Sequence, residues 1–195
     1  MIEVEKKFAM TDEEAKRILE GAVFVKEVIM IDSYCDTPDR RLSLKDWWLR
    51  ERNGRFELKV ASYAGEWKDQ VVNQYRELET DDEIAKALQL AGGGVLREQL
   101  KVAGYEPFAT IKTTRKKYKK DGFTIDMDIM DFGYTISEIE LMVESEAQMQ
   151  EAVDKIMNFA KAHGLSTKSV QGKLLEFLRR NDPPFFAKLV AAGAH

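Results

Sequence analysis

The chain has 195 residues, of which 44% are hydrophobic and 33% are charged, so it can bury the core of a single domain spanning residues 1–195. Its 30 basic and 34 acidic residues give a formal charge of −4, which disfavours a dedicated nucleic-acid or membrane-surface binder, because such proteins usually carry a basic excess. The lone cysteine, Cys35, cannot form an intramolecular disulfide. The charged first residues and the lack of a long apolar run lead us to expect neither a signal peptide nor a membrane-spanning helix. We therefore expect a cytoplasmic protein, and we expect it to be a monomer.

Hydrophobic periodicity and helix-capping signals divide the chain into strands and helices. In chain order the predicted elements are a strand at 2–8, a helix at 11–21, strands at 28–35, 47–52, 55–61 and 71–79, a helix from 80 to the glycines at 92–94, strands at 109–118, 122–130 and 135–143, a helix at 145–164, and helical stretches at 169–181 and 185–192 separated by two prolines. Short turns such as Asn53-Gly54 and Asp121-Gly122 join neighbouring strands. The pattern therefore predicts an antiparallel sheet in an α+β fold.

One face of these strands is apolar and the other is almost purely ionic. The first strand places Glu3, Glu5 and Lys7 on one face, and Asp126 and Asp128 alternate with apolar residues in the same way. One interpretation is a solvated sheet whose charged face meets water. The other is a sheet closed into a tunnel with its charged face inward. We favour the tunnel, because the opposite faces are apolar enough for helices to cover them.

A lumen that holds both acids and bases suits a particular kind of ligand. Arginine side chains bind phosphate oxygens through forked hydrogen bonds, and lysines act on them as point charges. The carboxylates would repel such a polyanion unless a hard cation sat between them, and carboxylates and phosphates are the usual ligands of Mg²⁺ or Mn²⁺. The pattern therefore predicts that the ligand is a complex of a metal ion with a polyphosphate.

Short motifs follow one another along the predicted strands. They are Glu3-Val4-Glu5-Lys6-Lys7, Trp48-Leu49-Arg50-Glu51-Arg52, Glu57-Leu58-Lys59, Tyr75-Arg76-Glu77-Leu78, Arg115, Asp126-Met127-Asp128, Asp131-Phe132-Gly133-Tyr134, Glu138-Ile139-Glu140 and Lys173. This series, which opens on an ExExK signature, resembles the CYTH superfamily of triphosphate tunnel metalloenzymes. The segments at 32–38 and 131–134 are most similar to animal-type thiamine triphosphatases. The resemblance extends from Ile2 to about Leu178 and implies an eight-stranded antiparallel tunnel flanked by helices. Cys35 and Glu51 depart from the family pattern, both at positions that should face outward.

The resemblance implies a role for each group of lumen residues. The residues that would bind the substrate are Lys7, Trp48, Arg50, Arg52, Lys59, Glu77, Arg115 and Lys173. The residues that would hold the metal ion are Asp126, Glu138 and Glu140, with Glu3, Glu5 and Asp128 nearby. The alternative for each acid is an ion pair with a neighbouring base. Lys7 and Tyr34 would assist proton removal from water, because the pKa of a lysine falls beside other cations; the alternative is that Tyr34 only hydrogen-bonds a phosphate.

Trp48 shares the parity of Arg50 and Arg52, so its indole should lie beside the triphosphate, where it would attract a thiazolium cation. Trp47 has the opposite parity and is expected in the outer core. The predicted function is Mg²⁺-dependent hydrolysis of thiamine triphosphate to the diphosphate and phosphate, by in-line attack of water. The alternatives are an inorganic tripolyphosphatase and a non-catalytic polyphosphate-binding module. The basic run at 115–120 is interpreted as a solvated hairpin rather than an RNA site.

Overall fold

The computed structural model describes residues 1–62, 66–69, 73–91 and 93–194, and within them eight strands close into an antiparallel barrel. The strands are β1 (Ile2–Phe8), β2 (Val23–Asp36), β3 (Trp48–Arg52), β4 (Arg55–Ala61), β5 (Asn73–Leu78), β6 (Glu106–Lys120), β7 (Phe123–Met130) and β8 (Thr135–Val143). Their order around the barrel is β1-β5-β4-β3-β2-β6-β7-β8, so β1 hydrogen-bonds both β5 and β8. The prediction of a closed tunnel in an α+β fold is confirmed; positions 71–72 of the predicted fifth strand lie outside the described residues.

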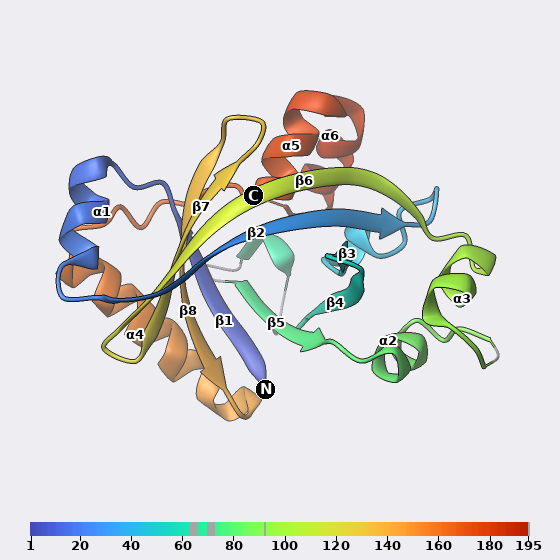
Figure 1. The fold of residues 1–195 in the computed structure, drawn as a ribbon, viewed down its shortest axis with the longest axis horizontal. Coiled ribbons are helices and arrows are strands. Elements are labelled where there is room, and N and C mark those ends of the chain that lie inside the picture. Colours follow the sequence, from blue (N-terminus) through green and yellow to red (C-terminus); the bar gives the residue numbers. More distant parts are fainter. Residues whose placement is uncertain (63–65, 70–72, 92, 195) are drawn as a thin grey trace.

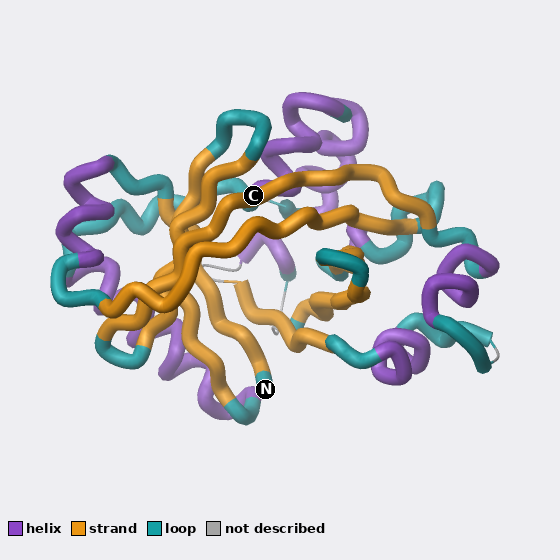
Figure 2. Tube along the Cα trace, in the orientation of Figure 1, coloured by secondary structure: helices purple, strands orange, loops and turns teal. Residues whose placement is uncertain are grey.

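The helices lie outside the barrel, where they cover its apolar faces (Figures 1 and 2). They are α1 (Asp12–Leu19), α2 (Asp81–Ala87), α3 (Leu96–Val102), α4 (Met149–Ala162), α5 (Lys173–Asn181) and α6 (Pro183–Ala192). In the described part of the chain, no helix is long and apolar enough to cross a membrane.

Several helix boundaries differ from the predictions. The second helix ends at Ala87, before the glycines, and α3 was not predicted, because its N-cap, Val95, makes no side-chain capping bond that the sequence could reveal. The helical stretch expected from 169 begins only at Lys173. Helix α6 starts at Pro183, because proline is well tolerated in a first helical turn, where backbone N–H groups have no partner within the helix.

Strands β2 and β6 are longer than predicted and form a curved ribbon across the top of the barrel in Figure 1. They pair in antiparallel register from Val23 opposite Lys119 to Asp36 opposite Glu106. The first residues of β2 show no apolar–polar alternation, since Val23, Phe24 and Val25 are all exposed. The periodic signal therefore detected only the inner part of this strand.

Packing of the outward faces explains why the charged faces point inward. Val4, Ile125 and Ile139 of the barrel pack on Ile156 and Phe159 of α4, in a cluster that also includes α1. A second cluster joins the barrel to α5 and α6, and a third joins β3, β4 and β5 to α2 and α3. Burying these apolar faces stabilises the fold by about 25 cal/mol per Å² removed from water. Because successive side chains of a strand alternate between faces, the charged set is left in the lumen.

Candidate active site

The barrel encloses a cavity of about 430 Å³ whose lining includes residues of every strand except β7 and of the start of α5. The predicted site residues that line it are Glu3, Glu5, Lys7, Tyr34, Trp48, Arg50, Arg52, Lys59, Glu77, Arg115, Glu138, Glu140 and Lys173. Asp126 and Asp128 of β7 are buried behind Arg115 rather than on the cavity surface. Glu51 faces outward as expected, where it forms an ion pair with Arg97 of α3.

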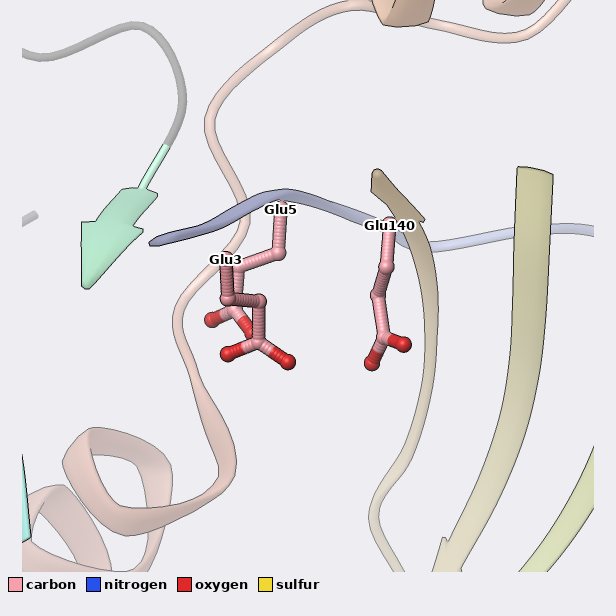
Figure 3. A group of neighbouring side chains, drawn as sticks. All are labelled: Glu3, Glu5 and Glu140. Atoms are coloured by element: carbon pink, nitrogen blue, oxygen red, sulfur yellow. The ribbon is translucent and has the colours of Figure 1, made fainter. Parts of the chain in front are cut away.

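Two overlapping groups of carboxylates could hold a metal ion. Glu3 and Glu5 of β1 and Glu140 of β8 each offer an oxygen within 4.8 Å of the others, and Figure 3 shows these three side chains directed to the same region. Asp126 and Glu138 form the second group, again with Glu140. Glu140 therefore belongs to both groups, because β8 lies between β1 and β7.

The electrostatics of these groups fit a divalent cation. Burial, together with the nearby Glu3, Asp126 and Glu138 carboxylates, raises the pKa of Glu140 to about 9. Burial also raises the pKa of Glu3 to about 7, although Lys59 opposes the shift. Oδ1 of Asp126 is buried and lacks a hydrogen-bond partner among the residues that the structure describes. A hard cation that prefers oxygen ligands would reduce the repulsion among these acids and would give the unpaired oxygen a partner.

Arg115 is bonded to acids on several sides. Its guanidinium lies 2.5 Å from a carboxylate oxygen of Asp126, 2.6 Å from Asp128, 2.6 Å from Glu138 and 3.7 Å from Glu140. These contacts hold the pKa of Arg115 well above its usual value, although burial alone would lower it. The guanidinium thus neutralises part of the acidic cluster. The expected role of Arg115 was phosphate binding, and it did not include these contacts with acids.

A second ion network joins β2, β3 and α5. Asp32 is fully buried and accepts two hydrogen bonds from Arg52, at 2.6 and 2.9 Å, and one from Lys173 Nζ at 2.8 Å. Burial would raise the pKa of Asp32, but these cations and Arg50 hold it far below its usual value. Arg50 also forms an ion pair of 2.7 Å with Glu57. Asp32 was not among the predicted site residues, although the register that pairs it with Arg52 places it on the lumen face.

The lysines of the lumen are also paired. Lys59 contacts Glu3, Glu5 and Glu77, the last two at 3.2 Å. Lys7 donates hydrogen bonds to Glu5 at 2.5 Å and to Asn73 at 2.8 Å. Burial lowers the pKa of Lys7, but the carboxylates of Glu5 and Glu138 more than offset burial, so its pKa is raised. The expectation that its pKa falls is therefore wrong, because its nearest charged neighbours are acids rather than cations.

The basic run at 115–120 is only partly solvated, which corrects its interpretation as a solvated hairpin. Lys116 is exposed, whereas Lys117 lines the cavity and lies 2.8 Å from Asp126 and 3.5 Å from Glu140. Lys117 has the same strand parity as Arg115, and this parity was the signal that could have placed it in the lumen.

Aromatic side chains form one part of the cavity wall. Trp48 lines the cavity, and its ring centroid lies 6.0 Å from that of Trp67, with the two planes at 65°. Trp47 packs against the outer cluster, which includes residues of α2 and α3, as its parity predicts. Trp67, in the short helix Trp67–Asp69, was not predicted in the site, because a loop residue carries no strand parity.

A closed antiparallel barrel that combines a carboxylate cluster with arginines and lysines in its lumen defines a class of tunnel protein suited to a polyanion and a divalent cation. The CYTH domain matches residues 1–173, and the chain belongs to this family. CYTH enzymes depend on divalent metal ions and act on triphosphate-type small molecules.

Individual relatives agree with this assignment. The chain is 29% identical to the thiamine-triphosphatase of Homo sapiens over 212 residues, which include 100% of this chain and 91% of the human protein. A solved structure from Pyrococcus horikoshii OT3 has a TM-score of 0.66 and 25% identity, covering 91% of this chain and 99% of that one. A putative adenylyl cyclase from Hippeastrum, described as having a dominant triphosphatase activity, has a TM-score of 0.55 at 15% identity, covering 100% and 99%; this likeness concerns the fold alone.

Proposed function

We propose that this protein hydrolyses the terminal phosphate of thiamine triphosphate, in a reaction that depends on Mg²⁺ or Mn²⁺. The observation that carries the proposal is the shared lumen of acids and bases, in which Glu140 belongs to two carboxylate groups and arginines and lysines surround them. Phosphoryl transfer to water requires charge neutralisation and in-line positioning more than covalent chemistry, and such a lumen supplies both. A mere anion binder has no use for so many carboxylates, which argues against a non-catalytic polyphosphate-binding module.

The proposed phosphate ligands are six basic side chains that approach the cavity from different strands and from α5. They are Lys7, Arg50, Arg52, Lys59, Arg115 and Lys173. Each of them contacts an acid in this structure, so a bound triphosphate must compete with these acids for the same donors. Arginine gains most in that competition, because its planar fork matches two phosphate oxygens at once.

The proposed metal ligands are Asp126, Glu138 and Glu140, with Glu3, Glu5 and Asp128 around them. A divalent cation bound there would supply charge neutralisation and polarisation of phosphate oxygens. The protein residues would contribute the carboxylate oxygens. Ion pairs of Arg115 and Lys117 with the acids of β7 hold those carboxylates in place.

Lys7 and Tyr34 are assigned to the reacting end of the substrate. Lys7 has a raised pKa and therefore remains a cation that binds phosphate rather than accepting a proton. Tyr34 pairs with Arg50 across β2 and β3 and lines the cavity, so its hydroxyl can reach the same phosphate oxygens as that arginine. We assign Tyr34 to phosphate binding and to orientation of the attacking water.

Comparison of three substrates with Mg²⁺ tests the proposed function. Phosphate release from thiamine triphosphate, tripolyphosphate and ATP should be measured side by side, and we expect the highest kcat/KM for thiamine triphosphate. A higher kcat/KM for tripolyphosphate would replace the proposal by an inorganic tripolyphosphatase, and no release from any of the three would favour a binding module.

Replacement of Trp48 by alanine tests the organic part of the substrate. A cationic thiazolium ring over an indole is stabilised by about 2 kcal/mol once water is excluded, which is roughly thirtyfold in specificity. We therefore expect Trp48→Ala to lower kcat/KM for thiamine triphosphate by about that factor and to change tripolyphosphate hydrolysis much less. Trp47→Ala is the matched control, because Trp47 packs in the outer cluster and should lower stability without changing the ratio of the two substrates. Equal losses on both substrates for Trp48→Ala would leave Trp48 with a supporting role only.

A further inference from the structure

Lys7 is held by two hydrogen-bond acceptors that come from different strands. Its Nζ donates to Glu5 of β1 at 2.5 Å and to Oδ1 of Asn73, the first residue of β5, at 2.8 Å. Asn73 lies opposite Glu5 in the β1–β5 register, so Lys7 reaches it diagonally across the two strands, a separation that a long side chain can bridge. Both Lys7 and Asn73 line the cavity, so the bond between them lies where a ligand would bind.

The side-chain amide of Asn73 has a defined orientation. A lysine ammonium can only donate, so the amide oxygen faces Lys7 and the amide nitrogen faces away from it. That nitrogen, Nδ2, lies 3.5 Å from the hydroxyl oxygen of Tyr75, a buried residue of the same strand. Burial raises the pKa of Tyr75 well above its usual value, so this hydroxyl stays protonated. The contacts of its oxygen and its nitrogen therefore favour a single orientation of the amide.

The methylene chain of Lys7 is confined by the segment that leads into α5. Gly172, the N-cap of this helix, approaches so closely that a Cβ atom added to it would lie 3.2 Å from Lys7 Cε. The Lys7 side chain is only 15% exposed. An ammonium group has three N–H groups, and Glu5 and Asn73 take two of them. One N–H is therefore left for a ligand in the cavity, and its direction is set by the other two.

Asn73 differs in charge from the partners of the other proposed phosphate ligands. In the described part of the chain, the side chains of Arg50, Arg52, Lys59, Arg115 and Lys173 donate hydrogen bonds only to carboxylates. Carboxylates repel phosphate, so each such bond opposes the approach of the ligand that the cation would bind. A neutral amide oxygen directs the Lys7 ammonium without that repulsion.

We propose that Asn73 is a positioning residue for Lys7, in that its amide oxygen directs the ammonium group toward the terminal phosphate and adds no negative charge beside it. The inference rests on the proposed function, in which Lys7 binds phosphate at the reacting end of the substrate. It deepens that function, because it shows how a lysine beside the acid Glu5 keeps one donor directed at the substrate.

Two substitutions of nearly the same size as asparagine separate the effect of position from that of charge. Asn73→Leu removes the acceptor, and we expect kcat for tripolyphosphate with Mg²⁺ to fall about tenfold, because the ammonium is no longer directed at the terminal phosphate. Asn73→Asp keeps an acceptor oxygen but adds a charge, which should raise KM about tenfold through repulsion of the phosphates, while kcat falls much less than in Asn73→Leu. Equal losses of kcat in the two variants would overturn the inference.

Gln74→Leu is the matched control, because Gln74 is the next residue of β5 and its side chain is on the opposite face of the strand. The same loss of an amide there should change neither kcat nor KM. If Asn73→Leu does not fold, Asn73→Ala, which also lacks the acceptor, takes its place.

A double-mutant cycle tests whether Asn73 acts through Lys7. In a Lys7→Met background, Asn73→Leu should lower kcat/KM little further, and a full tenfold loss there would overturn the inference. If Lys7→Met has no measurable turnover, the comparison of Asn73→Leu with Asn73→Asp decides alone. Failure of the proposed function has a different signature, namely no phosphate release by the wild-type protein or a preference for tripolyphosphate over thiamine triphosphate. Without any release, calorimetric affinity for tripolyphosphate replaces kcat, and both Asn73 variants should bind it more weakly than Gln74→Leu; equal affinities would overturn the inference.

Discussion

Replacing Glu140 by glutamine should lower Mg²⁺-supported turnover about a thousandfold, because a ligand of a catalytic metal ion contributes several kcal/mol of charge stabilisation. Glutamine keeps the size of the side chain but removes its charge, and Glu140 is shared by both carboxylate groups. The fold should survive, since burial and the neighbouring acids raise the pKa of Glu140 to about 9 and so already favour its uncharged form. Turnover as a function of Mg²⁺ concentration is the measurement, with the shift in Tm on adding Mg²⁺ as a readout that does not depend on activity.

Glu144→Gln provides the control for this experiment. Glu144 follows β8 directly and is exposed, so the same change of charge there should alter neither turnover nor the Tm shift. Wild-type Mg²⁺ dependence in Glu140→Gln would remove this residue from the metal site, and the assignment of the β1 and β7 acids would then need separate tests.

Replacing Asp32 by asparagine should destabilise the protein by about 3–5 kcal/mol at neutral pH, because removing one partner of a buried ion pair leaves the other charges uncompensated. Those charges are Arg52 and Lys173, both bonded to Asp32. Chemical denaturation at pH 7 measures the free energy of unfolding. We also expect a lower kcat/KM, since Asp32 positions two of the proposed phosphate ligands.

The pH dependence of the same variant gives a second readout. The pKa of Asp32 in the folded protein lies below its ordinary value of 3.8, so its stabilising contribution is complete above about pH 4 and is lost as the pH falls further. The difference in unfolding free energy between wild type and Asp32→Asn should therefore shrink below pH 4. Asp39→Asn, which alters an exposed pair, should change stability at neutral pH very little. A difference below 1 kcal/mol at pH 7, or one that stays constant down to pH 2, would contradict the role given to Asp32.

Local sequence signals were sufficient to predict a helix or strand where that element has its own hydrophobic periodicity or its own capping residue. The Thr11–Glu14 capping box is present at α1, and strands such as β1, β4 and β8 occur where alternation predicted them. The start of β2 and the whole of α3 were not predicted, because the former is exposed on both faces and the latter lacks a capping side chain.

The candidate site likewise contains residues that strand periodicity predicted and residues that it did not. Strand parity placed Arg50, Arg52 and Glu138 on the lumen face, and each of them lines the cavity. Parity also applied to Asp32 and Lys117, which were not among the predicted site residues although Asp32 has the parity of Tyr34 and Lys117 that of Arg115. Asp46 and Trp67 lie outside the strands, so no periodic signal could have indicated their place in the cavity wall.

The sequence by itself determined which side chains share a face, because the two-residue period of a strand is a local property of the backbone. It also indicated that the lumen would be ionic, since the residues that alternate with the charged ones along the strands are mostly apolar. Only the tertiary structure decided which acid meets which base. Asp32 and Lys173 are far apart in the chain yet lie 2.8 Å apart, because barrel closure and the docking of α5 bring them together. The pKa of Lys7 is raised rather than lowered, because its nearest charges are the carboxylates of Glu5, on the same face of β1, and of Glu138, opposite Lys7 on β8.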